Sequence, residues 1–238
     1  MAADDTPQAR PARHRTIRSF VVRTGRMTAG QQKAMDEHWP RFGLGFDTQP
    51  LDLDALFNRQ APRVLEIGFG NGEHLAALAQ THPDRDFIGI EVHPPGVGHL
   101  LHLTALHQLS NVRVSCHDAV EVLREQIPPA GLDEVLVLFP DPWHKARHNK
   151  RRLIQPAFVQ LLATRLKPGG VLRLATDWVP YAEQMLECVS ANPAFANLAT
   201  DNAYLPRDAG RAPTRFERRG ERLGHEVRDL AFCRVAGD

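Results

Sequence analysis

Residues 64–72 read VLEIGFGNG, and this stretch decides the fold that we expect for the chain. A short apolar run ends at Ile67, and alternate glycines then lead into residues with helical spacing. Glycines let a backbone turn tightly and approach a ligand at the electropositive start of a helix. The stretch therefore predicts a strand, a turn that binds a nucleotide-type ligand, and a helix, which together form the first unit of an α/β fold.

The alternation of strands and helices continues from this unit toward the C-terminus. Compact apolar runs closed by Gly, Pro or Asp predict strands at Arg63–Ile67, Phe87–Glu91, Val112–Cys116, Glu134–Phe139 and Val171–Thr176, and Val227–Cys233 can return as an edge strand. Apolar spacing of three and four residues predicts helices at Glu73–Gln80, Gly98–Leu109, Ala119–Gln126, Pro156–Leu166 and Tyr181–Ser190. Such alternation predicts a parallel sheet with right-handed crossovers and helices on both faces.

Length and composition predict one large domain with extensions, since 42% of the 238 residues are hydrophobic. We expect residues 1–17 to be a disordered basic extension and residues 18–238 to be a single domain. No run has the apolar core of a signal peptide or the ~18 apolar residues of a membrane helix. Cys116, Cys188 and Cys233 show no CxxC spacing, which argues against a disulfide framework or a zinc site. These features predict a cytoplasmic protein without a metal.

Basic and acidic residues are separated into blocks, although the formal net charge is only +1. Residues 1–26 hold 6 Lys and Arg against 2 Asp and Glu, residues 27–140 hold 7 against 15, and residues 141–152 hold 5 against 1. Basic segments on either side of an acidic middle are typical of a protein that meets a polyanion with one face. The alternative is a basic tail with an ordinary solvated loop.

The glycine turn favours a cationic cofactor over a pyrophosphate. A dinucleotide fingerprint GxGxxG requires its third glycine where this chain has Glu73. Glu66 also brings a carboxylate to the turn, where it can meet the amino acid end of S-adenosylmethionine. With Gly68 and Gly70, Glu66 is therefore a predicted cofactor contact.

Two further acids follow the next two predicted strands. Glu91 is at the separation from the turn at which a carboxylate takes the ribose hydroxyls of a nucleotide. Asp118 can accept from an adenine amino group at the same sheet edge. Acids that end strands are also common as simple helix caps, which is the alternative for each. Their order along the chain favours an adenosyl cofactor.

Residues 139–152 read FPDPWHKARHNKRR and combine three features. Proline on both sides of Asp141 restricts the backbone and holds this carboxylate at the end of a strand. Trp143 can stack on a base, and the cations that follow it can meet the phosphates of a folded nucleic acid. The alternative is a solvated basic loop beside a buried tryptophan.

Six segments together resemble the bacterial tRNA (guanine-N7)-methyltransferases. They are EIGFGNG at 66–72, GIEVH at 89–93, CHDA at 116–119, the stretch 139–152, ATDW at 175–178 and TRFE at 214–217. The resemblance runs from about Arg18 to Arg234 and includes RSFV and RTGR near the N-terminus. It implies a Rossmann-like class I S-adenosylmethionine-dependent methyltransferase fold with a mostly parallel seven-stranded sheet. It also implies transfer of a methyl group to N7 of guanine 46 in the variable loop of tRNA, with S-adenosylhomocysteine as product.

The resemblance also implies roles for individual residues. Cofactor contacts are implied at Glu66, Glu91, Asp118 and Asp141, and an active-site role at Asp141. Substrate contacts are implied at Lys145, Asp177, Thr214, Arg215, Phe216 and Glu217, and RNA contacts at Arg147, His148, Asn149, Lys150, Arg151 and Arg152. His144 and Ala146 stand where the motif more often has Pro and Lys, which puts the fine orientation of the substrate in question. The resemblance implies tRNA as the partner, bound also by the N-terminal and C-terminal segments, and we expect no membrane and no obligate protein partner.

Methylation of guanine N7 makes modest chemical demands. N7 carries a free lone pair, so the enzyme needs no strong base and has mainly to align the reacting atoms and exclude water. Asp141 can orient guanine by accepting from N1–H and the exocyclic amine, and can offset the positive charge of the methylated base.

Two other functions remain as alternatives. They are a methyltransferase of another RNA base, an amine or a protein, and a non-catalytic RNA-binding relative. An Asn-Pro-Pro-aromatic tetrad is common in methyltransferases of exocyclic amines, whereas this chain has Pro-Asp-Pro-Trp at 140–143. A relative that no longer binds the cofactor should also have lost cofactor-binding acids. Glu66, Glu91 and Asp118 are all present in this chain.

Overall fold

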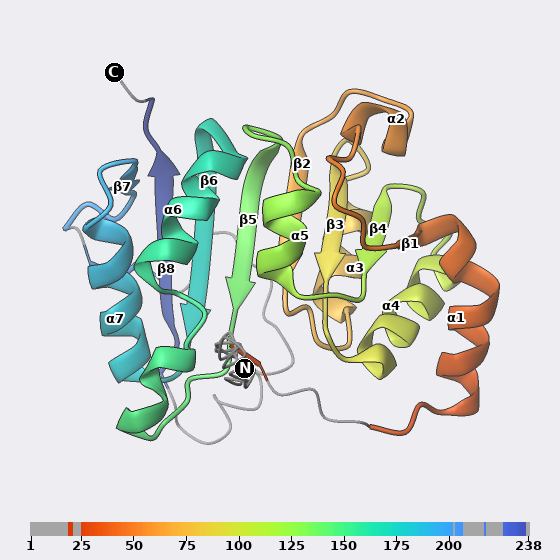
Figure 1. Cartoon of the computed structure of the whole chain (residues 1–238), viewed down its shortest axis with the longest axis horizontal. Helices are drawn as coiled ribbons and strands as arrows, with labels where there is room; N and C mark the ends of the chain where they lie inside the picture. Colours follow the sequence, from red (N-terminus) through yellow and green to blue (C-terminus); the bar gives the residue numbers. More distant parts are fainter. Residues whose placement is uncertain (1–18, 21–24, 202, 207–216, 218–225, 237–238) are drawn as a thin grey trace, which may run out of the picture.

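One mixed β-sheet forms the centre of the protein in the computed structural model, which describes residues 19–20, 25–201, 203–206, 217 and 226–236 (Figure 1). Within these residues the sheet has eight strands in the order β1-β4-β3-β2-β5-β6-β8-β7. Their bounds are β1 Gly43–Leu44, β2 Arg63–Ile67, β3 Asp86–Ile90, β4 Val112–Ser115, β5 Leu132–Leu138, β6 Leu166–Thr176, β7 Phe195–Asn197 and β8 Arg228–Arg234. Six of them, β1 to β6, are parallel, and β8 is antiparallel to both β6 and β7.

The strand order creates a switch point between β2 and β5. From β2 the chain adds β3 and then β4 on one side, and it returns to place β5 and β6 on the other side. The register pairs Glu66 of β2 with Gly89 of β3 and with Leu136 of β5. Ligands of open α/β sheets bind at the carboxyl ends of the strands beside such a point.

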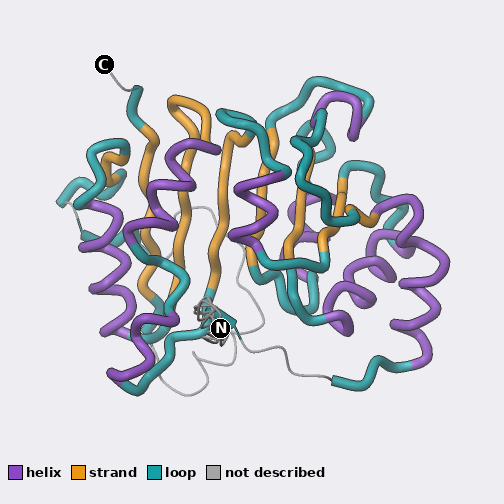
Figure 2. Tube along the Cα trace, viewed as in Figure 1, coloured by secondary structure: helices purple, strands orange, loops and turns teal. Residues whose placement is uncertain are grey.

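Helices cover both faces of the sheet (Figures 1 and 2). The helices are α1 Ala29–Phe42, α2 Leu53–Phe57, α3 Glu73–Thr81, α4 Pro94–Leu106, α5 Ala119–Glu125, α6 Pro156–Arg165 and α7 Val179–Ser190, with a 3-10 helix η1 at Ala146–Arg151. One hydrophobic cluster joins the sheet to α5, α6 and α7, and a second joins it to α1, α3 and α4. In the described part of the chain, no helix is both long and apolar enough to cross a membrane.

Local sequence explains where helix α1 begins and why β2 is a buried strand. Thr28 caps α1 through a capping box, because its hydroxyl accepts from the Gln31 N–H while the Gln31 side chain accepts from the Thr28 N–H. All five residues of β2 are buried. Burial on both faces is what a central strand of a parallel sheet requires, and it favours the apolar Val64, Leu65 and Ile67, while the buried charges of Arg63 and Glu66 have partners in Asp54 and His74.

The predicted α/β class is confirmed, with differences in the smaller elements. The described residues form eight strands, whereas the family resemblance implied seven and the apolar runs predicted six. The runs missed β1 and β7, because strands of two and three residues are too short to show a periodic pattern. The helices α1 and α2 were also not predicted, since α1 buries only Ala34 and Phe42. Strand β8 lies inside the sheet and not at its edge, because β7 pairs with its outer side. The predicted extension 1–17 lies outside the described residues.

Candidate active site at the carboxyl edge of the sheet

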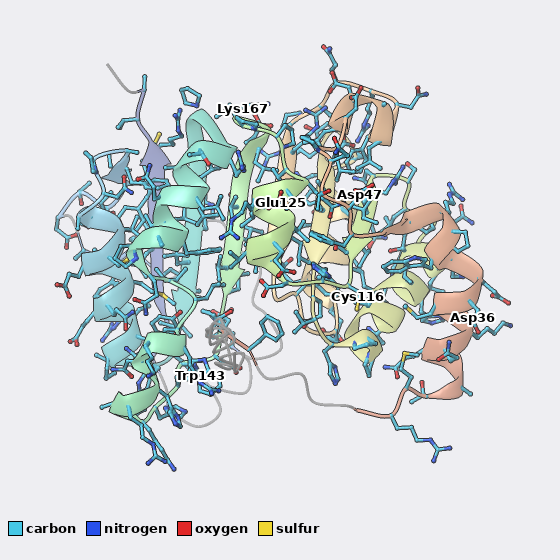
Figure 3. All side chains as sticks on the ribbon, in the orientation of Figure 1. Asp36, Asp47, Cys116, Glu125, Trp143 and Lys167 are labelled. Carbon is cyan, nitrogen blue, oxygen red and sulfur yellow. The ribbon has the colours of Figure 1, made fainter. Side chains whose placement is uncertain are left out.

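Five predicted site acids come together at one edge of the sheet. Asp118, Glu91, Glu66, Asp141 and Asp177 lie at or directly after the carboxyl ends of β4, β3, β2, β5 and β6, in that spatial order. Neighbouring strands are ~4.8 Å apart, so these five strand ends span roughly 19 Å. Figure 3 shows Trp143 at this edge and Lys167 at the opposite edge of the sheet. A row of carboxylates suits a cationic ligand and repels phosphate.

The glycine turn between β2 and α3 is open on the side away from the protein. Gly68, Gly70 and Gly72 all have positive φ, of +73°, +61° and +76°. A Cβ added to Gly68 would meet no atom within 4 Å, whereas one added to Gly96 of α4 would lie 2.0 Å from the Gly70 carbonyl oxygen. The start of α4 is therefore packed directly on the turn, while the space at Gly68 is free to receive a ligand.

The Glu91 carboxylate organises the cofactor side of the edge. Its Oε2 accepts from the Gly70 N–H at 2.9 Å, and its Oε1 accepts from the N–H groups of Val92 and His93 at 2.7 and 3.0 Å. A carboxylate has about four acceptor positions, so roughly one remains for a ligand hydroxyl. Burial raises the pKa of Glu91, while these three hydrogen bonds act in the opposite direction.

Glu66 is paired inside the protein with a residue that the sequence reasoning missed. Its carboxylate is 3% exposed, and the Nδ1 atom of His74 lies 3.1 and 3.2 Å from its two oxygens. An ionised carboxylate can only accept, so Nδ1 of His74 is the donor. Nε2 of His74 is buried without a hydrogen-bond partner among the described residues. The only sequence signal for this pair was a polar residue on the buried face of α3.

One oxygen of Asp118 caps a helix, which was the alternative to a ligand contact at this residue. Its Oδ1 accepts from the Val120 N–H at 2.8 Å and caps α5. The side chain is half-buried, and its second oxygen has no hydrogen bond or ion pair to any described residue. A cap and a ligand contact are therefore compatible at this residue.

The loop that carries Asp141 is held in a strained backbone conformation. Phe139 and Trp143, which flank Pro140-Asp141-Pro142, have φ of +52° and +47°. Each non-glycine residue in this left-handed region costs about 1–3 kcal/mol, and such strain persists only where surrounding contacts enforce it. The Asp141 side chain is exposed and has no hydrogen bond or ion pair to any described residue. The loop thus presents a carboxylate that is fixed through its backbone and free at its oxygens.

The cations after Asp141 form a short helix and not an irregular loop. Lys145, Arg147 and Lys150 are exposed on or beside η1. No carboxylate among the described residues forms an ion pair with them. Partial burial and the neighbouring cations lower the pKa of His148. A lowered pKa makes His148 a weaker source of positive charge, so the Lys and Arg side chains carry most of the attraction for phosphate here.

Trp143 is held by other parts of the protein. Its Nε1 donates to the Ser19 carbonyl at 3.0 Å, the Arg151 guanidinium lies 4.9 Å from its ring centroid, and His148 packs against it edge-on at 5.8 Å. Through Trp143, these contacts connect Ser19 to η1. They also cover part of the indole ring that was predicted to stack on a base.

Arg152 does not fit the RNA contact predicted for it. It is only 4% exposed, and its guanidinium donates to the carbonyls of Pro142 and Pro180 and to Oε1 of Gln184. The same group lies 4.9 Å from the Tyr181 ring centroid. Burial lowers its pKa. A guanidinium enclosed in this way has no surface to offer a phosphate.

The remaining predicted residues are placed unequally. Asp177 is half-buried after β6, and Glu217 is fully buried. Asn149 is also half-buried, and its carbonyl accepts from Arg152 N–H and Gln155 Nε2. Thr214, Arg215 and Phe216 lie outside the described residues. No group of three His, Cys, Asp or Glu side chains in the described ranges is arranged to hold a metal ion.

Comparison with known proteins identifies the family. A family model described as "Putative methyltransferase" matches residues 60–230. A tRNA (guanine-N(7)-)-methyltransferase of Ectopseudomonas mendocina is 56% identical over 220 residues, which cover 92% of each chain. One of Burkholderia pseudomallei is 58% identical over 231 residues, covering 97% of this chain and 86% of the relative. The chain belongs to the tRNA (guanine-N(7)-)-methyltransferase family.

A solved structure agrees on the fold. The crystal structure of the 16S rRNA methyltransferase KamB matches with a TM-score of 0.60 at 18% identity, covering 82% of this chain and 99% of that chain. At this identity the likeness concerns the fold alone. It confirms the predicted Rossmann-like class I methyltransferase fold.

One departure from the common family motif has a structural partner. The His144 ring packs edge-on against Trp178 with ring centroids 4.4 Å apart. Trp178 directly follows Asp177, so this contact connects the Asp141 loop to the end of β6. The sequence could not show the contact because the two residues are far apart in the chain.

Proposed function

We propose that this chain transfers the methyl group of S-adenosylmethionine to N7 of guanine 46 in the variable loop of tRNA. The observation that carries the proposal is the Asp141 carboxylate, exposed and unpaired among the described residues, on a strained loop beside the glycine turn. Family membership supports the reaction, because the relatives at 56–58% identity are named tRNA (guanine-N(7)-)-methyltransferases. The tRNA substrate and three free cysteines favour a cytoplasmic location.

The residues of the glycine turn fit an adenosyl cofactor. The open space at Gly68 would receive it, and Glu91 would accept from a ribose hydroxyl with its remaining acceptor position. Asp118 would accept from the adenine amino group through the oxygen that does not cap α5. Glu66 and the row of acids would favour the ammonium and sulfonium charges. When bound, S-adenosylmethionine supplies an electrophilic methyl group.

Asp141 would act on the guanine. Its oxygens would accept from N1–H and from the exocyclic amine, which fixes the ring and points N7 toward the cofactor side of the switch point. Alignment of this kind contributes up to ~7–11 kcal/mol to catalysis. The same carboxylate would lie near the positive charge that develops on the base, and this interaction strengthens as the reaction proceeds. Asp177 would assist in orienting the base.

Phosphate contacts would come from the cations on one side of the site only. Lys145, Arg147, Lys150 and Arg151 lie after β5, on the side of the switch point away from Glu91 and Asp118. We propose that tRNA approaches from this side, so that its phosphates avoid the acids of β3 and β4. The family resemblance adds Thr214 to Glu217 and the two terminal segments to the proposed tRNA contacts.

Methyl transfer with mapping of the product tests the proposal. The full chain is incubated with methyl-labelled S-adenosylmethionine and a tRNA transcript that has guanine at position 46, beside the same transcript with adenine there. We expect label in N7-methylguanosine in the first transcript alone. Label in another nucleoside, or equal label in both transcripts, would contradict the proposed substrate position. An Asp141→Asn variant serves as the control for contaminating activity.

A further inference from the structure

Two adjacent arginines, Arg151 and Arg152, lie in opposite environments. Arg151 is half-buried, with its guanidinium 4.9 Å from the Trp143 ring centroid. Arg152 is 4% exposed and makes three hydrogen bonds inside the protein. Sequence position therefore groups these residues, while the fold separates them.

The hydrogen bonds of Arg152 connect two strand ends of the site. Its Nε donates to the Pro142 carbonyl at 2.8 Å, and Pro142 directly follows Asp141. A second nitrogen, Nη1, donates to Oε1 of Gln184 at 2.6 Å and to the Pro180 carbonyl at 3.3 Å. Pro180 and Gln184 belong to α7, the helix that follows Asp177. One planar guanidinium thus spans from the loop after β5 to the helix after β6.

Such a link controls where the Asp141 carboxylate lies. The ring of Pro142 fixes its φ, so a shift of the Pro142 carbonyl is passed to the preceding residue with little relaxation. The strained φ values of Phe139 and Trp143 show that the loop would not keep this shape without external contacts. The guanidinium provides such a contact, since its fork geometry donates in two directions.

We propose that Arg152 is a positioning residue, which holds the Asp141 carboxylate in its reactive place through the Pro142 carbonyl and makes no contact with tRNA phosphate. This inference rests on the proposed function, in which Asp141 acts on the guanine. It separates Arg152 from the exposed cations of η1, which attract tRNA but do not place the reacting groups.

Single variants test the inference against a matched control. We expect Arg152→Met to lower the single-turnover rate by about 10- to 100-fold, the loss that a misplacement of about 1 Å causes. The affinity for S-adenosylmethionine and the salt dependence of tRNA binding should stay unchanged. Arg152→Lys should recover part of the rate, because an ammonium can still donate to the Pro142 carbonyl.

Arg165 is the control for simple loss of stability. It is half-buried, and its guanidinium, like that of Arg152, donates to two carbonyls, those of Leu123 and Arg124, but it lies just before the amino end of β6. Arg165→Met should lower the melting temperature without lowering the single-turnover rate. If Arg152→Met does not fold, Gln184→Leu removes one acceptor of the same guanidinium and should lower the rate in the same direction by a smaller factor.

A double-mutant cycle separates this inference from the proposed function. If Arg152 acts through Asp141, the double variant Asp141→Asn with Arg152→Met should be about as slow as Asp141→Asn alone. If the rate loss of the double variant equals the product of the two single losses, the inference is overturned and the proposed function stays intact. A normal rate for Arg152→Met, or a tRNA salt slope lowered by ~0.7–0.9, would overturn it too. A normal rate for Asp141→Asn would instead overturn the role of Asp141.

Discussion

The two halves of the carboxyl edge hold their carboxylates in different ways. On the side of β2, β3 and β4, the acids are bound through their oxygens: Glu66 to His74, Glu91 to three N–H groups, and Asp118 to the start of α5. On the side of β5, Asp141 is positioned through its backbone and its oxygens are free of described partners. The acids of the first half are therefore already held by hydrogen bonds before a ligand binds. In the second half, Asp141 keeps its acceptors for a substrate.

The largest expected effect comes from changing the free carboxylate. Asp141→Asn should lower the single-turnover rate by at least about a hundredfold, the order of loss found for groups that stabilise charge in a transition state. The melting temperature should change little, because no described residue pairs with these oxygens. Rapid-quench experiments with enzyme in excess over labelled S-adenosylmethionine, at saturating tRNA, measure this single-turnover rate. A variant within twofold of the unmodified chain would show that the two halves of the edge do not differ in role.

An intermediate effect is expected from a bound carboxylate. Glu91→Gln keeps the shape but replaces one acceptor with a donor that faces backbone N–H groups. We expect the dissociation constant for S-adenosylmethionine to rise about tenfold, which corresponds to ~1.4 kcal/mol, with a small loss of melting temperature. Calorimetry with the full chain measures both. Asp118→Asn is a useful comparison, because Oδ1 can still cap α5. Equal losses of tRNA affinity and cofactor affinity would contradict a cofactor role for Glu91.

A smaller effect is expected from the exposed cations. Arg147→Ala should raise the tRNA dissociation constant several-fold and lower the slope of its logarithm against log salt by ~0.7–0.9, because one phosphate contact is lost. Arg152→Met is the matched comparison from the same cationic run and should leave the slope unchanged. Filter binding at four or more salt concentrations gives the slopes. Identical slopes for Arg147→Ala and the unmodified chain would rule out a phosphate contact at Arg147.

The smallest effect concerns pH. Because burial raises the pKa of Glu91 in the free protein, this carboxyl gains its proton at a higher pH than an ordinary glutamate does. Only the ionised form accepts from a ribose hydroxyl and from all three N–H groups, so cofactor affinity should fall as the pH drops through that raised pKa. Titrations from pH 7.5 to 5 should show this decline in the unmodified chain. A decline that persists in Glu91→Gln would assign it to another group.

The site could be located from the sequence because its key residues are close to strand ends. Glu66, Glu91, Asp118 and Asp141 each follow or end an apolar run, and parallel strands bring all their carboxyl ends to one edge. The same reasoning could not find His74, because its pairing with Glu66 depends on the direction of one side chain on α3. It also grouped Arg152 with its basic neighbours, since charge is visible in a sequence while burial against α7 is not.

The sequence by itself determined the α/β class, the glycine turn, the acids of the carboxyl edge and the family, because these depend on local periodicity and on residues adjacent in the chain. The tertiary structure alone decided that Glu91 accepts hydrogen bonds mainly from backbone N–H groups, that Trp143 donates to the Ser19 carbonyl, and that Arg152 faces inward. Those outcomes depend on which groups from distant segments compete for the same donors and acceptors. That competition is settled only when the packed chain excludes water from them.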